Sequence, residues 1–149
     1  MRPVPGYSLW LGNAADARDA PRLLDAGLEA VVALAIEEPP TTLVRELVHC
    51  RFPLMDGPDN PMWLLRMVMD TVAALAAGRV PTLVCCGAGM SRAPAVVAIT
   101  IHRLTGKPPE ECLRGLAELG PLDVSPGLWR ELLAAENARR DKPDKPGGW

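Results

Sequence analysis

The stretch VCCGAGMSRAP, residues 84–94, carries the side chains best suited to chemistry. Cys86 precedes Arg92 by six positions, and the residues between them are mostly small. An apolar segment before the loop and Pro94 after it predict a strand, a loop and a helix in that order. Backbone amides of a small-residue loop and the N-terminus of a helix both attract anions, and an arginine binds two phosphate oxygens at once. The stretch therefore predicts a phosphate-binding loop made of Gly87, Ala88, Gly89, Met90, Ser91 and Arg92.

Cys86 stands at the mouth of this loop, where the same dipoles and the guanidinium favour thiolate over thiol. A thiolate attacks phosphorus to form a phosphocysteine, and the loop amides with Arg92 stabilise the developing oxygen charge. The spacing thus predicts Cys86 and Arg92 as catalytic residues. The competing interpretation is a strand-to-helix turn that happens to contain a buried cysteine.

The other cysteines are expected to be structural. Cys85 ends the predicted strand and is expected to point into the core, and a bond between Cys85 and Cys86 would close a strained ring. Cys50 and Cys112 are more typical of buried thiols than of resolving thiols. Because the chain has no Cys-x2-Cys pair, we expect no zinc site, and we expect no cofactor.

Composition indicates one domain and limits its partners. The chain has 149 residues, 48% of them hydrophobic, and a formal net charge of −2, which gives no general attraction to nucleic acid or anionic membranes. No segment approaches the roughly 20 apolar residues of a membrane-spanning helix. We expect a catalytic domain over residues 1–140, a flexible tail over 141–149, no membrane anchor and a cytoplasmic location. The oligomeric state stays open.

Alternating short apolar and longer amphipathic segments predict an α/β fold, with a central, mostly parallel, twisted sheet of four to five strands flanked by helices. Asn60 and Pro61 are expected to be the N-cap and the first-turn residue of a helix. The expected strands are 8–11, 30–36, 49–55 and 80–85, and the expected helices are 15–26, a short one from Thr41 or Thr42 to Leu47, 61–77, 94–105, 110–119 and 126–139.

The segment CGAGMSR resembles the phosphate-binding loop of dual-specificity phosphatases, a family of the cysteine-dependent protein tyrosine phosphatase superfamily. YSLWLGNAAD, AVVALAI, FPLMDGPDNP and SPGLWRELLAAE occur in the order that the family has them. The resemblance implies a protein tyrosine phosphatase-like fold and a protein phosphatase acting on phosphoserine, phosphothreonine and phosphotyrosine, or on small phosphomonoesters. It also implies an aspartate general acid about 30 residues before the cysteine. Asp56 fits that position, and Asp59 is the rival.

Two positions depart from the family pattern. Cys85 stands where most relatives have histidine, and Ala93 stands where most have serine or threonine, whose hydroxyl helps sulfur to leave the phosphocysteine. Slow turnover is therefore expected, as in the phosphatases of regenerating liver, which also have Arg-Ala-Pro here. The alternative is a pseudophosphatase that binds phosphate as a recognition module. The loop has no lysine or histidine between Cys86 and Arg92, which disfavours polyphosphorylated inositols.

Overall fold

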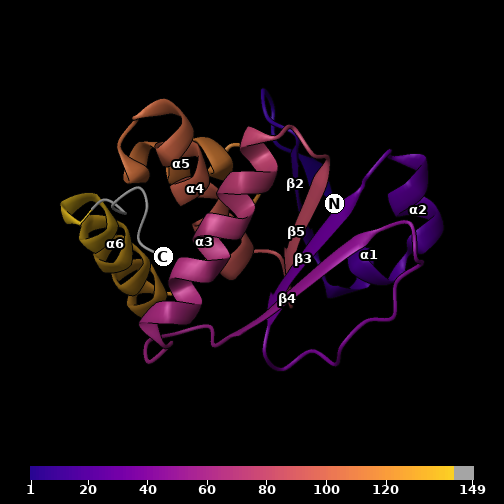
Figure 1. The fold of residues 1–149 in the computed structure, drawn as a ribbon, viewed down its shortest axis with the longest axis horizontal. Helices are drawn as coiled ribbons and strands as arrows, with labels where there is room; N and C mark the ends of the chain where they lie inside the picture. Colours follow the sequence, from indigo (N-terminus) through magenta and orange to yellow (C-terminus); the bar gives the residue numbers. More distant parts are fainter. Residues whose placement is uncertain (143–149) are drawn as a thin grey trace, which may run out of the picture.

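The computed structural model describes residues 1–142 and has a five-stranded sheet at its centre (Figure 1). The strands lie in the order β1-β2-β5-β3-β4; all neighbours are parallel except β1 and β2. This arrangement confirms the predicted α/β fold with a mostly parallel sheet of four to five strands. The strands are β1 (Arg2–Pro3), β2 (Leu9–Asn13), β3 (Ala30–Ala35), β4 (Val48–Leu54) and β5 (Thr82–Cys86).

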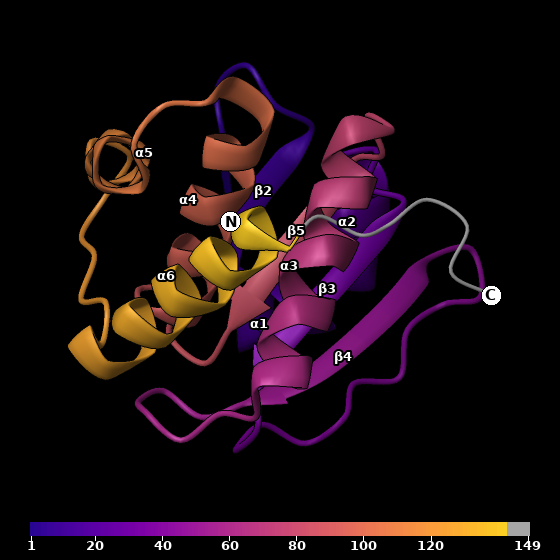
Figure 2. The same cartoon turned by 60° about the vertical axis from the view of Figure 1, so that its left-hand side comes forward.

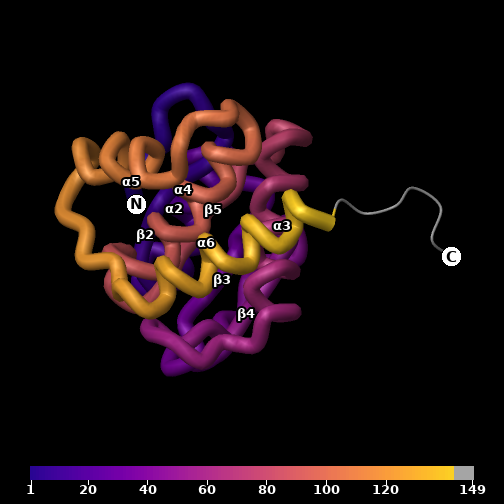
Figure 3. Tube along the Cα trace, turned by 90° about the vertical axis from the view of Figure 1, so that its left-hand side faces the viewer, coloured from indigo at the N-terminus to yellow at the C-terminus, as the bar shows by residue number. Residues whose placement is uncertain are grey.

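Helices cover both faces of the sheet. Figure 1 shows α1 and α2 on one side and the other four helices on the opposite side. The last helix, α6, packs against α3 and α4 and runs beside them in Figures 2 and 3. The helices are α1 (Ala14–Arg18), α2 (Ala20–Asp25), α3 (Met62–Ala77), α4 (Arg92–Thr105), α5 (Pro109–Ala117) and α6 (Pro126–Asp141).

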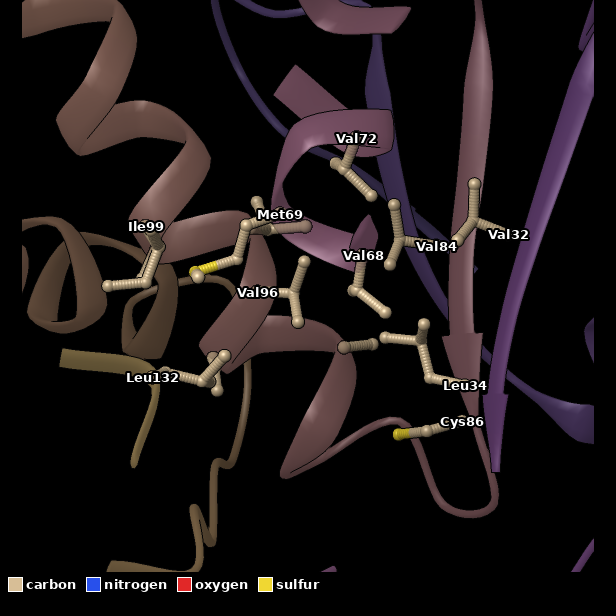
Figure 4. Close-up of a cluster of buried hydrophobic side chains, with 14 of the residues drawn as sticks. Val32, Leu34, Val68, Met69, Val72, Val84, Cys86, Val96, Ile99 and Leu132 are labelled. Carbon is tan, nitrogen blue, oxygen red and sulfur yellow. The ribbon is translucent and has the colours of Figure 1, made fainter. Parts of the chain in front are cut away.

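The strands divide the apolar side chains between two cores. Successive residues of a strand point to opposite faces of the sheet. In β5, Val84 and Cys86 belong to the larger core, whereas Leu83 and Cys85 belong to the smaller core with Leu23 of α2. Figure 4 shows the larger core, in which side chains of β3 and β5 meet those of α3, α4 and α6. The alternation therefore sends the two adjacent cysteines to opposite faces.

Two predicted helices are wrong. Residues 41–47 form no helix, since this short segment with three β-branched residues cannot nucleate one alone. The expected helix over 15–26 is two helices, because Pro21 lacks the N–H that a continuous helix needs. Asn13 caps α1 with a reciprocal capping box, and the side chain of Asp19 accepts a hydrogen bond from the amide of Arg22 to begin α2.

The predicted N-cap at Asn60 is also wrong. Pro61 is the N-cap residue of α3 and the helix has no side-chain cap, because the Asn60 side chain bonds the preceding turn instead. Strand β1 was not predicted, since two residues carry no periodic signal.

At the C-terminal end, α6 runs to Asp141, one residue into the predicted tail; most of that tail, residues 143–149, lies outside the described residues. In the described part of the chain, no helix combines the length and apolarity needed to cross a membrane.

Candidate active site

Three adjacent parallel strands bring chemically active side chains to one edge of the sheet. Cys86 is the last residue of β5, Glu37 lies two residues after β3, and Asp56 lies two residues after β4. Ligands of open α/β sheets bind beyond the carboxyl ends of the strands. A pocket of about 210 Å³ lies at this edge, lined by Glu37, Asp56, Cys86, Ala88, Met90, Ser91, Arg92 and Asp123. The structure thus brings Cys86, Arg92 and Asp56 together.

The loop between β5 and α4 has the backbone geometry of an anion site. Within residues 1–142, the amides of residues 87–91 donate no hydrogen bond to another protein group. Gly89 has a φ of +76°, and a Cβ there would lie 2.8 Å from the carbonyl oxygen of Gly12, so the loop requires glycine at this position. The N-terminus of the 14-residue helix α4 follows directly. These amides are therefore free to bind an anion.

Arg92 is 4% exposed and is held by groups from two neighbouring strand ends. Its Nη1 donates to Glu37 Oε2 at 2.6 Å and to the carbonyl oxygen of Leu54 at 2.9 Å, and its Nη2 donates to Glu37 Oε1. The hydrogen bonds to Glu37 raise the pKa of Arg92, and those from Arg92 lower the pKa of Glu37. Both groups are therefore charged at neutral pH.

The remaining edge of the guanidinium is unused. Arg92 Nε is buried and has no hydrogen-bond partner among the described residues. Glu37 takes the two terminal nitrogens, which leaves the edge made by Nε and the second hydrogen of Nη2 available for a bidentate contact. A buried hydrogen-bond donor without a partner raises the free energy of the folded protein, so a ligand that offers an acceptor to this edge gains binding free energy.

Ser91 connects the phosphate-binding loop of residues 87–92, called the cradle below, to the loop that carries Asp56. Its Oγ donates to Asp56 Oδ1 at 2.5 Å and accepts from the amide of Ser125 at 3.0 Å. The hydroxyl is thus placed to orient a carboxylate.

The loop of Asp56 is shaped by Asn60, which is 8% exposed. The Asn60 Oδ1 accepts from the amide of Met55 at 2.8 Å, and its Nδ2 donates to the carbonyl oxygens of Met55 and Gly57, both at 3.1 Å. These three bonds close a tight turn around Asp56. The residue expected to cap a helix instead positions the candidate general acid.

Asp59, the rival general acid, does not line the pocket. Its backbone is left-handed with φ at +74°, and its amide donates to Glu131 of α6 at 2.5 Å. The fold uses Asp59 at the junction between the turn and α6. Of the two aspartates, Asp56 is the one that lines the pocket together with Cys86 and Arg92.

The neighbouring cysteine has a different environment. Cys85 is 2% exposed in the smaller core, and burial raises the pKa of its thiol to about 12. Cys85 is therefore a neutral thiol at neutral pH, and all four cysteines are free.

In the part of the chain that the structure describes, no group of three or more histidine, cysteine, aspartate or glutamate side chains is arranged to hold a metal ion.

Two residues of the pocket were not anticipated from the sequence. Glu37 directly follows the predicted strand 30–36, and a place just after a buried parallel strand was a usable signal. Asp123 lies between α5 and α6, and its amide donates to the carbonyl oxygen of Met90 at 2.9 Å. No local pattern indicates that contact, because it depends on how the two loops meet.

Known proteins with the same architecture are dual-specificity phosphatases and their relatives. Human dual specificity protein phosphatase 15 is 24% identical over 152 residues, a match that covers 97% of this chain and 50% of that protein. The chain thus spans about half the length of this curated relative. No protein-family model matches the chain.

Solved structures match over nearly the whole chain. The crystal structure of human DUSP28 matches with a TM-score of 0.79 and 25% identity, covering 94% of this chain and 97% of that one. A mouse putative dual specificity phosphatase complexed with zinc tungstate has a TM-score of 0.77 and 21% identity, covering 97% of each chain. Human tyrosine phosphatase-like serine/threonine/tyrosine-interacting protein has a TM-score of 0.76 and 20% identity, covering 92% of this chain and 95% of that one.

Proposed function

We propose that the chain is a member of the dual-specificity phosphatase family of the protein tyrosine phosphatase superfamily and that it hydrolyses phosphate monoesters through a phosphocysteine. The substrate is a phosphorylated protein or a small phosphomonoester. The four free cysteines fit a reducing, cytoplasmic compartment.

In the first step, the thiolate of Cys86 attacks phosphorus and the bond from phosphorus to the leaving oxygen breaks. The amides of residues 87–91 and the free edge of Arg92 hold the three equatorial oxygens. The Asp56 carboxyl gives its proton to the leaving oxygen, so an alcohol or phenol departs.

In the second step, water attacks phosphorus and the sulfur–phosphorus bond breaks. Asp56, now a carboxylate, accepts the proton from this water, and Cys86 returns to thiolate as inorganic phosphate leaves. Ser91 and Asn60 hold the Asp56 loop for both proton transfers.

The observation that carries the proposal is the buried, unpartnered Nε of Arg92 in a pocket that also contains Cys86 and Asp56. The test is the hydrolysis of para-nitrophenyl phosphate, followed through the first turnover and into steady state. We expect the wild-type protein to show a burst followed by slow turnover, and Cys86→Ser to lose both while still binding inorganic phosphate.

Cys85→Ala is the matched control, because it removes the adjacent thiol from the opposite face of the sheet. We expect Cys85→Ala to keep the burst. Turnover retained in Cys86→Ser, or abolished equally in a folded Cys85→Ala protein, would contradict the assignment of the nucleophile.

A recognition module is the second candidate function, and Ala93 favours it. This residue is fully buried at the start of α4 and offers no hydroxyl to the departing sulfur. Under this alternative, the wild-type protein would bind phosphate with neither burst nor turnover, so the same experiment separates the two functions.

A further inference from the structure

The proposed phosphate pocket is acidic. Its lining residues include the three carboxylates of Glu37, Asp56 and Asp123, whereas Arg92 is the one cation among them. Arg92 is already ion-paired with Glu37. Even when Asp56 carries the proton that it gives to the leaving oxygen, Asp123 leaves an uncompensated negative charge at the pocket. This charge raises the free energy of a bound phosphate dianion unless the substrate brings positive charge.

The carboxylates are accessible to a ligand. Glu37, Asp56 and Asp123 are all exposed. The Asp123 side chain makes no hydrogen bond or ion pair within residues 1–142, although its backbone is tied to the cradle through Met90. Its carboxylate thus stands at the pocket without a cationic partner among residues 1–142.

Two other arginines, Arg18 and Arg51, line a neighbouring pocket that Cys86 also lines, and both bind other groups. Arg18 pairs with Glu38 at 2.7 Å, and Arg51 donates to the carbonyl oxygens of Ile36 and Glu38. Neither arginine lines the pocket. Among residues 1–142, Arg92 is thus the one cation that lines this site.

Exposed apolar side chains accompany these charges. Ile36 precedes Glu37 and is 48% exposed, Met55 precedes Asp56 and is 41% exposed, and Met90 of the cradle is 36% exposed. A small aminoalkyl phosphate leaves these side chains uncovered. A peptide that extends across the pocket covers them on both sides of its phosphoresidue.

From this pattern we infer that the preferred substrate is a phosphopeptide with lysine or arginine next to the phosphoresidue, and that Asp123 selects it. This inference rests on the proposed phosphatase function and adds the substrate class. Asp123 contributes by attracting the flanking cation, and the apolar rim contributes by contacting the peptide beyond it.

Binding to Cys86→Ser protein tests the inference without depending on turnover. The probes are three phosphotyrosine peptides that differ only in the residues on each side of the phosphotyrosine, which are lysine, glutamine or glutamate. A fourth probe, O-phosphoethanolamine, is a small phosphate that also carries a positive charge. At low salt we expect the lysine peptide to bind about tenfold more tightly than the glutamate peptide, with a difference that shrinks as salt is added. It should also bind more tightly than O-phosphoethanolamine.

Charge variants identify the selecting residue. In the same background, Asp123→Asn should reduce the lysine-to-glutamate preference about threefold, and Asp123→Lys should remove or reverse it. Glu110→Gln is the control, because Glu110 is an exposed carboxylate in the first turn of α5 and does not line the pocket. It should leave the preference unchanged.

Equal binding of the three peptides, or a preference that Asp123→Lys does not change, would overturn the inference. Tighter binding of O-phosphoethanolamine than of the lysine peptide would overturn the peptide class. If the wild-type protein releases no phosphate, the proposed phosphatase function is wrong. The inferred peptide preference is judged separately, because it is measured by binding.

Discussion

Arg92 and Glu37, 55 residues apart in the sequence, form a two-point ion pair that fixes the plane of the guanidinium. The carboxylate binds both terminal nitrogens, and the carbonyl oxygen of Leu54 binds one of them as well. The Nε edge is left as the part of Arg92 that an anion can use. Glu37 therefore positions the arginine and also limits how phosphate reaches it.

The proposed role of Arg92 predicts that lysine cannot replace it. Lysine keeps the charge but lacks the planar fork that binds Glu37 on one edge and phosphate on the other. We expect Arg92→Lys to lower kcat/KM for para-nitrophenyl phosphate by at least about 100-fold. Arg18→Lys changes a second arginine paired with the same loop, through Glu38, and should leave kcat/KM within about twofold. Near-normal activity of Arg92→Lys would contradict the bidentate contact.

Asp56 as general acid predicts a dependence on the leaving group. Asparagine matches the shape of Asp56 but has no proton to give, so Asp56→Asn should slow phenyl phosphate hydrolysis about 100-fold or more. It should slow para-nitrophenyl phosphate much less, because that leaving group departs without protonation. The measurement is kcat/KM across a series of aryl phosphates.

Asp59→Asn is the control for this prediction. Asparagine tolerates the left-handed backbone of Asp59, so the variant should fold and keep the wild-type dependence on the leaving group. If kcat/KM fell steeply for the poorer leaving groups in Asp59→Asn but not in Asp56→Asn, Asp59 would be the general acid instead of Asp56.

Much of this architecture was predictable because its signals are local. Continuous apolar segments indicated β3 and β5, and glycines with an arginine indicated the cradle that follows β5. Because period 2 places successive strand residues on opposite faces, the different environments of Cys85 and Cys86 also follow from the strand. Their roles differ although they are adjacent.

The remaining features depend on contacts between distant segments. Asn60 satisfies the preference of asparagine for local backbone bonds by closing the turn of Asp56 rather than by capping α3, and the sequence permits either. Asp123 reaches the pocket because its loop bonds Met90. These contacts depend on tertiary packing between distant segments, so a short stretch of sequence cannot predict them.

Glu136 predicts a stability effect outside the active site. This carboxylate of α6 is 1% exposed and accepts hydrogen bonds from Arg103 at 2.8 Å and Arg139 at 2.9 Å. Burial alone would raise the pKa of Glu136, but the two arginines outweigh burial and hold the pKa below its ordinary 4.5. Glu136→Gln removes the buried negative charge that Arg103 and Arg139 share and should destabilise the fold by roughly 3 kcal/mol at neutral pH.

The pH dependence of this effect has a definite sign. A lowered carboxyl pKa stabilises the folded state above 4.5, and that contribution disappears as pH falls through the folded-state pKa. Urea unfolding of wild type and Glu136→Gln should therefore show a difference that narrows below pH 4.5. Asp70→Asn removes the exposed partner of Arg103 and should cost less than about 1 kcal/mol. An equal loss in the two variants would contradict the role given to burial.

The last prediction concerns the second chemical step. Ala93 is fully buried one residue after Arg92, at the position where the family resemblance implies a serine or threonine hydroxyl that helps sulfur to leave the phosphocysteine. If hydrolysis of the phosphocysteine limits turnover, Ala93→Ser should raise the steady-state rate severalfold and shrink the burst of para-nitrophenol measured by stopped flow. Ala95→Ser adds the same hydroxyl to α4 at another fully buried position and controls for a general effect on the helix. An unchanged steady-state rate in Ala93→Ser would mean that formation of the phosphocysteine limits turnover, since the added hydroxyl assists only its breakdown.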